Sequence, residues 1–443
     1  MDKFVITGGN PLKGEIAVAG AKNVALKILV ASLLTDEELV IHNVPQISDV
    51  QFMLEVLTEL GVQSTVEGNT IRVVNKHKTD AKVPLEVGSR LRTSSMVMGP
   101  LLARYGRATT PNPGGCRLGA RPIDRHIDAL KDMGADITYN SNDGYFYGHT
   151  EGLHGATIHF EKNTHTGTET LILAAVLAKG QTILENAAEE VEIDDLIACL
   201  NKMGANIKRT DPRTIVIDGV SALHGAEYSI IPDRNEEITF AIAAAMTKGD
   251  VTVKNSQREH LAAFLEAFKN AGGTYQPVDG TTTRYCCAGG VRPTDIATSQ
   301  YPGFMTDWQA PWAVFMTQAT GVSTIHETVF ESRFSYVSEL KKMGAHIEFF
   351  DPDVPHPDTF YNFNWADRVE GSHQAIRITG PTALHNAVLE ITDLRAGATL
   401  VLAALVAPGE SIIHGVGQVD RGYERIEERL RTLGATIERV KEE

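Results

Sequence analysis

Two hydrophobic patterns alternate along this chain and predict its architecture. The first ends six times in the same way, as LTELGV, LKDMGA, LNKMGA, FKNAGG, LKKMGA and LRTLGA, with the glycines Gly61, Gly134, Gly204, Gly272, Gly344 and Gly434. Each copy has the spacing of an amphipathic helix, and its glycine suits the left-handed position that closes a helix. The intervals are 73, 70, 68, 72 and 90 residues. Because this period exceeds the roughly 20–50 residues of solenoid repeats, it indicates a small α/β subdomain used six times.

The second pattern is a helix that is apolar on every side, followed by a glycine or a polar turn and a β-like run. It is clearest at 171–186, 240–255 and 400–415 and weaker at 26–43, 96–112 and 312–327. A helix that is apolar all round has to be enclosed. Alternating runs such as TIRVV and TIVID suit half-buried strands. We therefore expect an α/β (α+β) fold with three units in each domain, buried helices at the centre and sheets outside.

Length and charge narrow the possible functions. A chain of 443 residues is too long for one ordinary core, so two domains are expected. The 41 basic and 56 acidic residues give a net charge of −15, which argues against nucleic acid as a partner. A few cations in a cleft can still bind an anionic small molecule.

Targeting and cofactor signals are few. The apolar run at 398–407 is shorter than the ~20 residues of a membrane span, and MDKFVITGG lacks a signal-peptide pattern. We expect a cytoplasmic protein that does not insert into membranes. The four cysteines lack metal-ligand spacing, and the P-loop, Rossmann and H-E-x-x-H patterns are missing, so neither a metal nor an organic cofactor is expected.

Polar residues gather where the apolar helices are expected to begin. The stretches that precede these helices are Lys22-Asn23, 92–95, 164–170, 233–236, Thr306-Asp307 and 393–395. Helix N-termini carry free N–H groups and favour anions. If the buried helices of each domain run parallel, their N-termini form one face, and two such faces would make a cleft for a multiply phosphorylated ligand. Lys22, Arg92, Arg395 and Asp307 would line that cleft. Ordinary capping is the alternative, and for Asp307 both interpretations stay open.

A glycine-rich loop, PGGCRLGARPIDRH at 113–126, holds the candidate nucleophile or general acid. Cys116 lies among glycines and near two arginines, which stabilise a thiolate. The other cysteines, Cys199, Cys286 and Cys287, are expected to be structural. His126 and His165 are possible acid–base groups, and a hydrogen-bonded role is the favoured alternative for His126.

Six segments along the chain closely resemble the UDP-N-acetylglucosamine 1-carboxyvinyltransferase family. They are AGAKN (19–23), PGGC with GARPID (113–124), FMTDWQA (304–310), ETVFESRF (327–334), TDLRAGA (392–398) and DRGYERIEERL (420–430). The resemblance covers essentially the whole chain and implies a pair of inside-out α/β barrels, the EPSP synthase-like fold. We expect one domain at 22–232, a second formed by 1–21 and 233–443, and an active site in the cleft between them.

The resemblance also implies a reaction. It is transfer of the enolpyruvyl group of phosphoenolpyruvate to the 3′-hydroxyl of UDP-N-acetylglucosamine by addition–elimination with release of phosphate, the first committed step of peptidoglycan synthesis. The implied catalytic residues are Cys116, Asp307 and Lys22. The implied phosphoenolpyruvate contacts are Lys22, Asn23, Arg121, Arg395 and Arg421. The implied nucleotide-sugar contacts are Arg92, Arg121, Pro122, Ile123, Asp124, Arg125, Asp307 and Val329.

Three alternatives stay open at this point: an enolpyruvyl transferase for shikimate 3-phosphate, one for another nucleotide sugar, and a non-catalytic nucleotide-sugar sensor. Two stretches depart from the family pattern. Residues 162–167 read KNTHTG, where more apolar residues are typical, and 351–372 read as an insertion. We expect the insertion to be a surface excursion whose aromatics, Phe360, Tyr361, Phe363 and Trp365, dock back onto the domain. A monomer or weak oligomer is expected.

Overall fold

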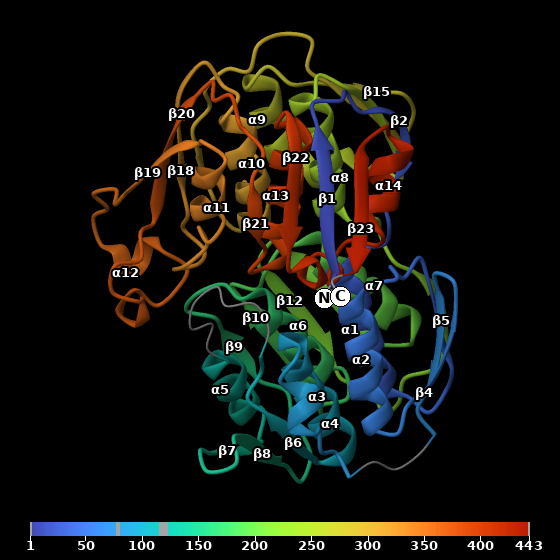
Figure 1. The fold of residues 1–443 in the computed structure, drawn as a ribbon. Coiled ribbons are helices and arrows are strands. Elements are labelled where there is room, and N and C mark those ends of the chain that lie inside the picture. Colours follow the sequence, from blue (N-terminus) through green and yellow to red (C-terminus); the bar gives the residue numbers. More distant parts are fainter. Residues whose placement is uncertain (1, 77–79, 115–122, 442–443) are drawn as a thin grey trace. The chain divides into compact units, whose positions relative to one another are not determined.

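The computed structural model describes residues 2–76, 80–114 and 123–441, and these divide into two compact units. Residues 20–76, 80–114 and 123–231 form one unit, called the 20–231 unit, and residues 2–19 and 232–441 form the other. In the described residues each unit holds three sheets. Of these six sheets, five have four strands and one has three strands. The predicted α/β organisation, with helices inside and sheets outside, is confirmed in both units (Figure 1).

The 20–231 unit is built around three central helices. These are α1 (Lys22–Ala31), α4 (Met98–Tyr105) and α6 (His165–Ala175). The outer helices are α2 (Ser48–Glu59), α5 (Asp124–Asp132) and α7 (Val191–Lys202). The short helices are η1 (Ser32–Leu34), α3 (Leu85–Gly88) and η2 (Arg92–Val97).

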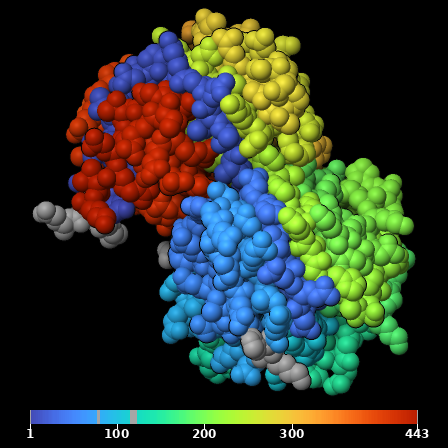
Figure 2. Space-filling model, turned by 90° about the vertical axis from the view of Figure 1, so that its right-hand side faces the viewer, coloured from blue at the N-terminus to red at the C-terminus, as the bar shows by residue number. Residues whose placement is uncertain are grey.

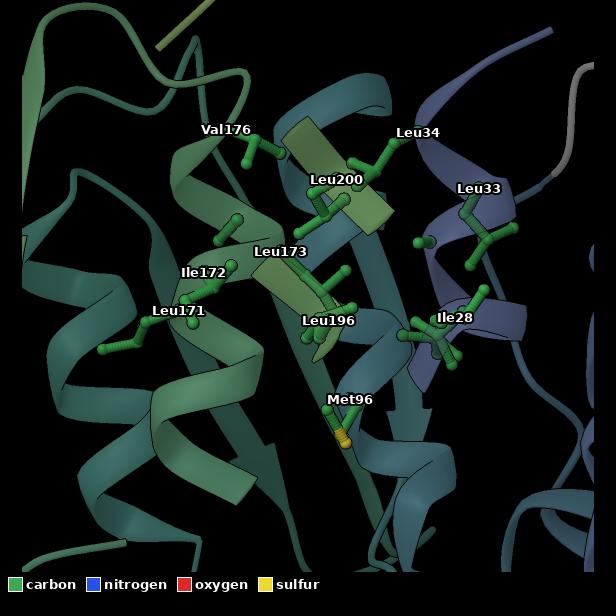
Figure 3. Packing of buried hydrophobic residues seen from close by; sticks show 14 of the residues in the cluster. Ile28, Leu33, Leu34, Met96, Leu171, Ile172, Leu173, Val176, Leu196 and Leu200 are labelled. Atoms are coloured by element: carbon green, nitrogen blue, oxygen red, sulfur yellow. The ribbon is translucent and has the colours of Figure 1, made fainter. Parts of the chain in front are cut away.

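Its sheets have the strand orders β13-β3-β5-β4, β11-β12-β10-β9 and β6-β8-β7. Their strands are β3 (Leu39–His42), β4 (Gln63–Glu67), β5 (Thr70–Val74), β6 (Arg107–Pro111), β7 (Asp136–Asn140), β8 (Tyr145–His149), β9 (Thr157–His159), β10 (Gln181–Glu185), β11 (Asn206–Asp211), β12 (Thr214–Asp218) and β13 (Ala226–Ser229). Side chains of α1, η1, η2, α6 and α7 meet in the apolar core, where Ile28, Met96 and Leu196 pack together (Figure 3).

The second unit repeats this plan around α8 (Arg234–Met246), α10 (Gln309–Met316) and α13 (Leu394–Val406). Its outer helices are α9 (Ala262–Asn270), α11 (Val337–Lys342) and α14 (Ile426–Thr432). The short helices are η3 (Arg258–Leu261), η4 (Thr306–Trp308), α12 (Pro357–Phe360), η5 (Trp365–Asp367) and η6 (Val416–Gln418). Every residue of α8 and α10 is buried, as an all-apolar helix requires.

The sheets of this unit have the orders β21-β22-β1-β23, β15-β16-β14-β2 and β17-β18-β20-β19. Their strands are β1 (Asp2–Gly8), β2 (Lys13–Ala17), β14 (Asp250–Lys254), β15 (Thr274–Pro277), β16 (Thr282–Cys286), β17 (Ile296–Ala297), β18 (Gly321–His326), β19 (His346–Phe350), β20 (Ala375–Gly380), β21 (Val388–Glu390), β22 (Gly409–His414) and β23 (Thr436–Lys441). β1 lies between β22 and β23, so both ends of the chain share one sheet (Figure 1). On the surface, residues near the N-terminus (blue) lie against those near the C-terminus (red) (Figure 2).

The six repeated glycines close their helices in one way. All six have φ between 86° and 100°. At the first copy the N–H of Gly61 donates to the carbonyl oxygen of Thr58, and the N–H of Val62 donates to that of Leu57, both at 2.9 Å. The same pair of bonds recurs at the other five glycines. This is the Schellman closure, which satisfies the last carbonyl groups of a helix and needs a residue that tolerates positive φ. The predicted helix ends are therefore confirmed.

The predicted starts of several buried helices were wrong by about one turn. Residues 165–170, 234–236 and 394–395 were expected to precede their helices, but they lie inside α6, α8 and α13. Lys22 and Asn23 likewise are the first residues of α1. The side-chain oxygens of Thr164, Asp233 and Asp393 accept the first free N–H groups, so helix geometry begins directly after them.

The predicted surface excursion is confirmed. Residues 351–374 connect β19 to β20, and they contain α12 and η5 (Figure 1). Tyr361 and Phe363 are buried, with 2% and 7% of their surface exposed, whereas Phe360 stays half exposed. No helix in residues 2–76, 80–114 and 123–441 is long and apolar enough to cross a membrane.

Candidate active site

Lys22 opens the buried helix α1 of the 20–231 unit. The residue before it, Ala21, has no side-chain oxygen that could cap the helix. Nζ of Lys22 lies 2.7 Å from Oδ2 of Asp49, in the first turn of α2, and Asp49 is almost fully buried. Gly20 permits this entry to the helix, because a Cβ there would lie 1.6 Å from the carbonyl oxygen of Asn43. The lysine is thus held as a cation at the positive end of a helix, where an anion would be stabilised.

A second polar group in this unit surrounds the start of α5. His126 is 6% exposed, and its Nε2 lies 3.0 Å from Oγ1 of Thr166 in α6. Burial, with the charges of Arg92 and Arg125, lowers the pKa of His126 to about 3. Burial also lowers the pKa of Arg125. A neutral His126 next to two cations favours the hydrogen-bonded role over acid–base catalysis.

A third group lies deeper, at the start of α6. Nζ of Lys27 lies 3.3 Å from one carboxylate oxygen of Glu169, and Nε2 of His165 lies 3.2 Å from the other. Lys27 and Glu169 are both buried. Burial lowers the pKa of His165, but the Glu169 carboxylate outweighs burial, and the net pKa is raised. His165 therefore differs from His126 in tending to carry a proton.

The second unit places Asp307 between two guanidinium groups. Asp307 lies in η4, and one of its carboxylate oxygens accepts a hydrogen bond from Nη2 of Arg333. Its other oxygen lies 3.4 Å from Nη2 of Arg395, in the first turn of α13. The side chains of Arg333 and Arg395 are 5% and 8% exposed, against 22% for Asp307. The carboxylate is thus the most accessible member of the trio.

Arg395 has further partners that keep it charged and fixed. Its Nη1 donates to the hydroxyl oxygen of Tyr423 at 3.1 Å, and its backbone N–H donates to Asp393 at 3.0 Å. Burial lowers the pKa of Arg395, but Tyr423, Asp307 and Asp233 outweigh it, and the net pKa is raised. Nη1 of Arg421 lies 3.2 Å from Oε1 of Gln418. The unit therefore holds preorganised cations next to one accessible carboxylate.

Val329 lies in a loop that follows β18, and this loop is hydrogen-bonded to η4, the segment that contains Asp307. The fully buried Glu327 accepts hydrogen bonds from the N–H groups of Val329 and Phe330, at 2.8 and 3.1 Å. Its other oxygen accepts from the hydroxyl of Thr306 at 2.8 Å. Burial raises the pKa of Glu327 against the opposing effect of Arg333 and these donors. The loop is therefore tied to the residue directly before Asp307.

The structure distributes the predicted residues over two groups. Lys22, Asn23, Arg92, Ile123, Asp124 and Arg125 belong to the 20–231 unit, and Asp307, Val329, Arg395 and Arg421 belong to the other. Cys116, Arg121 and Pro122 lie outside the described residues. Across the described ranges, no three His, Cys, Asp or Glu side chains form a metal-binding group.

Sequence reasoning gave no role to Asp49, Arg333 or Tyr423. The segments that contain Arg333 and Tyr423 were among those that carry the family resemblance. Asp49 had a weaker signal, an acidic residue in the first turn of an amphipathic helix.

Comparison with known proteins defines the family. The sequence pattern of EPSP synthase (3-phosphoshikimate 1-carboxyvinyltransferase) matches residues 6–430. A UDP-N-acetylglucosamine 1-carboxyvinyltransferase from Solibacter usitatus is 45% identical over 441 residues, which cover 99% of this chain and 100% of the relative. The chain belongs to the EPSP synthase family.

A further relative and two solved structures are also similar to this chain. The protein of the same description from Acidobacterium capsulatum is 44% identical, covering 99% of this chain and 96% of the relative. The enolpyruvyl transferase NikO from Streptomyces tendae shares the fold, with a TM-score of 0.85 at 23% identity over 99% of this chain and 98% of that one. EPSP synthase from Acinetobacter baumannii gives 0.72 at 18% identity, covering 100% of both chains.

The low pKa of His126 predicts a specific pH effect on stability. A histidine that is neutral when folded but titrates normally when unfolded destabilises the protein as the pH falls from about 6.5 towards 3, because the unfolded chain binds the extra proton. Replacing His126 by asparagine, which keeps a polar group near Thr166, should remove this dependence of stability on pH. We expect wild type to lose up to about 1.4 kcal/mol per pH unit more than His126→Asn. Urea unfolding at pH 7, 6 and 5 measures the difference, and equal slopes for both proteins would contradict the assignment.

Proposed function

We propose that this chain transfers the enolpyruvyl group of phosphoenolpyruvate to the 3′-hydroxyl of UDP-N-acetylglucosamine and releases phosphate. Support comes from its membership of the EPSP synthase family. Further support comes from relatives named UDP-N-acetylglucosamine 1-carboxyvinyltransferase, which are 41–45% identical over nearly the whole chain. The single structural observation that carries the proposal is Asp307 between Arg333 and Arg395. That arrangement offers a proton acceptor beside cations that suit a carboxylate and a phosphate.

The cations of the 20–231 unit are assigned to substrate binding. Lys22 and Asn23, at the start of α1, are proposed to bind phosphoenolpyruvate together with Arg121, Arg395 and Arg421. Arg92, Arg125 and the neighbouring residues 121–124 are proposed to bind the nucleotide sugar. Because the pKa of His126 is lowered to about 3, its imidazole is neutral, and the cations available to the nucleotide sugar here are Arg92 and Arg125.

Asp307 is proposed to take the proton of the attacking hydroxyl. A carboxylate paired with two guanidinium groups is a weak base, since its neutralisation would leave both cations unpaired. Phosphoenolpyruvate carries a phosphate and a carboxylate that compete for Arg395, at present 3.4 Å from Asp307. Binding of this substrate would therefore draw one of the two cations away from Asp307 and make its carboxylate a better proton acceptor. The hydroxyl oxygen forms the new C–O bond at carbon 2 of phosphoenolpyruvate, and Cys116 is proposed to protonate carbon 3. A proton then leaves carbon 3 and phosphate leaves carbon 2, which restores the double bond.

Two alternatives share the chemistry. One is transfer to shikimate 3-phosphate, which the description of the family pattern names, and the other is transfer to a different nucleotide sugar. Full-length relatives at 41–45% identity favour UDP-N-acetylglucosamine over shikimate 3-phosphate. The proposal also places the reaction in the cytoplasm, with the protein as a monomer or weak oligomer.

Phosphate release tests the proposed function directly. The purified chain is incubated with phosphoenolpyruvate and, separately, with UDP-N-acetylglucosamine, other UDP-sugars or shikimate 3-phosphate. We expect phosphate release with UDP-N-acetylglucosamine at a kcat/KM at least about tenfold above that with any other acceptor, because a site built to hydrogen-bond one substrate rejects analogues that leave those groups unpaired. No release with any acceptor would refute the proposed activity, and release with shikimate 3-phosphate alone would replace it.

The Asp307→Asn variant tests the base. The amide keeps the size of the side chain but cannot accept the hydroxyl proton, so kcat should fall by about 10²- to 10⁴-fold. Binding of UDP-N-acetylglucosamine, measured by calorimetry, should change far less than kcat. The matched control is Glu266→Gln, an exposed charge on α9 of the same unit. A kcat in Asp307→Asn within about threefold of wild type would remove Asp307 from the catalytic role.

The Cys116→Ser variant tests the loop cysteine. The family resemblance implies that fosfomycin alkylates Cys116, so we expect the wild-type chain to gain one adduct by mass spectrometry and Cys116→Ser to gain none. A serine hydroxyl is a far poorer nucleophile than a thiolate. The control is Cys286→Ser, in β16, which should keep the adduct. Labelling that persists in Cys116→Ser, or disappears in Cys286→Ser, would transfer the role to another residue.

A further inference from the structure

The excursion at 351–374 replaces what is a tight turn in the other hairpins. Hairpins β4–β5 and β11–β12 are joined by two residues, and β7–β8 and β15–β16 by four. The β19–β20 connection has 24 residues. The sheet plan itself therefore does not need the excursion, since the same plan is completed elsewhere by two or four residues.

The excursion leaves the sheet beside the loop that carries Val329. β20 pairs with β18 in antiparallel register, with His326 opposite Ala375, so the N-terminal end of β20 meets the C-terminal end of β18. The last residue of β18, His326, and the residues that follow it, 327–333, form the loop already described, here called the 326–333 loop. The excursion and the 326–333 loop thus begin at neighbouring points of one sheet.

Four hydrogen bonds join the two segments. The hydroxyl of Tyr361 lies 3.0 Å from Nε2 of His326, and the N–H of Asn362 donates to the carbonyl oxygen of Thr328 at 2.9 Å. The N–H of Glu327 donates to the backbone carbonyl oxygen of Gln374 at 2.8 Å. The side-chain amide of Gln374 donates to the backbone carbonyl oxygen of Glu331 at 3.1 Å. Burial lowers the pKa of His326 and raises that of Tyr361, so a neutral imidazole meets a protonated hydroxyl. These bonds hold both the first and the middle residues of the loop.

A cluster of stacked aromatic rings packs inside the excursion. The rings of Tyr361 and Trp365 stack with centroids 4.8 Å apart and planes 7° apart. The guanidinium of Arg368 lies 3.8 Å from the centroid of the Trp365 ring, a cation–π contact on the other ring of the stack. Phe363 is buried against both rings, at 5.0 and 6.0 Å. This small aromatic cluster fixes Tyr361 and Asn362, which contact the loop.

On its inner side the same loop is coupled to Asp307. Glu327 binds Thr306, the residue before Asp307, and Arg333 binds Asp307 itself. The ring of Phe330 packs 5.3 Å from the Arg333 guanidinium. A displacement of residues 326–331 would therefore affect Val329, Thr306 and Arg333.

We propose that the 351–374 excursion is a positioning element for the acceptor substrate: it fixes the 326–333 loop so that Val329 and Asp307 meet the nucleotide sugar. This inference rests on the proposed function for its substrate. Tyr361 and Asn362 are positioning residues, because they act through the loop and not on the reacting atoms.

Two variants and one control test the proposal. In the first variant, Asn-Gly replaces residues 352–373, which leaves a four-residue connection as in β7–β8 and keeps Asp351 and Gln374. The second is Tyr361→Phe, which removes only the hydroxyl bound to His326. The control is Val369→Thr, at a side chain of the excursion that is 64% exposed.

The first readout needs no substrate. Hydrogen exchange of the full chain reports the amides of 326–331. Exchange should speed up by about tenfold in the shortened variant, because the two hydrogen bonds made by Tyr361 and Asn362, of ~1 kcal/mol each, are lost while those of Gln374 remain. Val369→Thr should match wild type. Unchanged exchange in the shortened variant would overturn the proposal, whatever the enzyme's activity turns out to be.

The second readout separates positioning from general stability. KM for UDP-N-acetylglucosamine should rise by roughly tenfold in the shortened variant and about threefold in Tyr361→Phe, the losses expected for two hydrogen bonds and for one. KM for phosphoenolpyruvate should change by less than about twofold, since it is bound by other residues. A purely structural excursion would lower the melting temperature and leave both KM values unchanged, which would overturn the proposal. A wild-type chain without activity would refute the proposed function, while the exchange readout would still decide whether the excursion holds the loop.

Discussion

The enclosure of six apolar helices is the constraint on which the rest of this structure depends. α8 and α10 are buried at every residue, and α1, α4, α6 and α13 at most of theirs. Such helices are stable only where other helices and sheets cover every side, and in each unit three sheets and three amphipathic helices provide that cover. The free N–H groups at the start of a buried helix must then be satisfied locally. Polar side chains are consequently concentrated at these six starts.

The six helix starts are of two kinds, and three of the candidate site residues lie at starts without a side-chain cap. Thr164, Asp233 and Asp393 cap α6, α8 and α13 with side-chain oxygens. Ala21, Leu91 and Met305 precede α1, η2 and η4, and their apolar side chains offer no such oxygen. Lys22, Arg92 and Asp307 lie at the starts of those three segments. A lysine or arginine at a helix N-terminus opposes the helix dipole, so an anion bound there would offset an existing cost.

The fold could be predicted from the sequence because its signals are local. The Schellman glycines, the all-apolar helices and the alternating strands each involve residues within a few positions of one another. Helix starts were less accurate, because Thr164 and Asp393 are equally compatible with a loop residue and a cap. The ion pairs of the site were out of reach for a different reason. Lys22 with Asp49, and Asp307 with Arg333 and Arg395, join residues 26 to 88 positions apart, and only the packing of helices selects those partners.

Local closure of each helix also explains how six similar units can carry different chemistry. Because every Schellman turn satisfies its own helix end, a unit keeps its shape when a neighbouring connection changes length. The β19–β20 connection illustrates this freedom: 24 residues stand where two or four complete the equivalent hairpins, and β18, β19 and β20 still form a regular sheet. The place where these residues are added is specific, however. They leave the sheet beside His326, at the end of β18 from which the chain continues to Glu327 and Arg333. Glu327 binds Thr306 and Arg333 binds Asp307, so this large departure from the repeat is connected to an accessible carboxylate held between arginines.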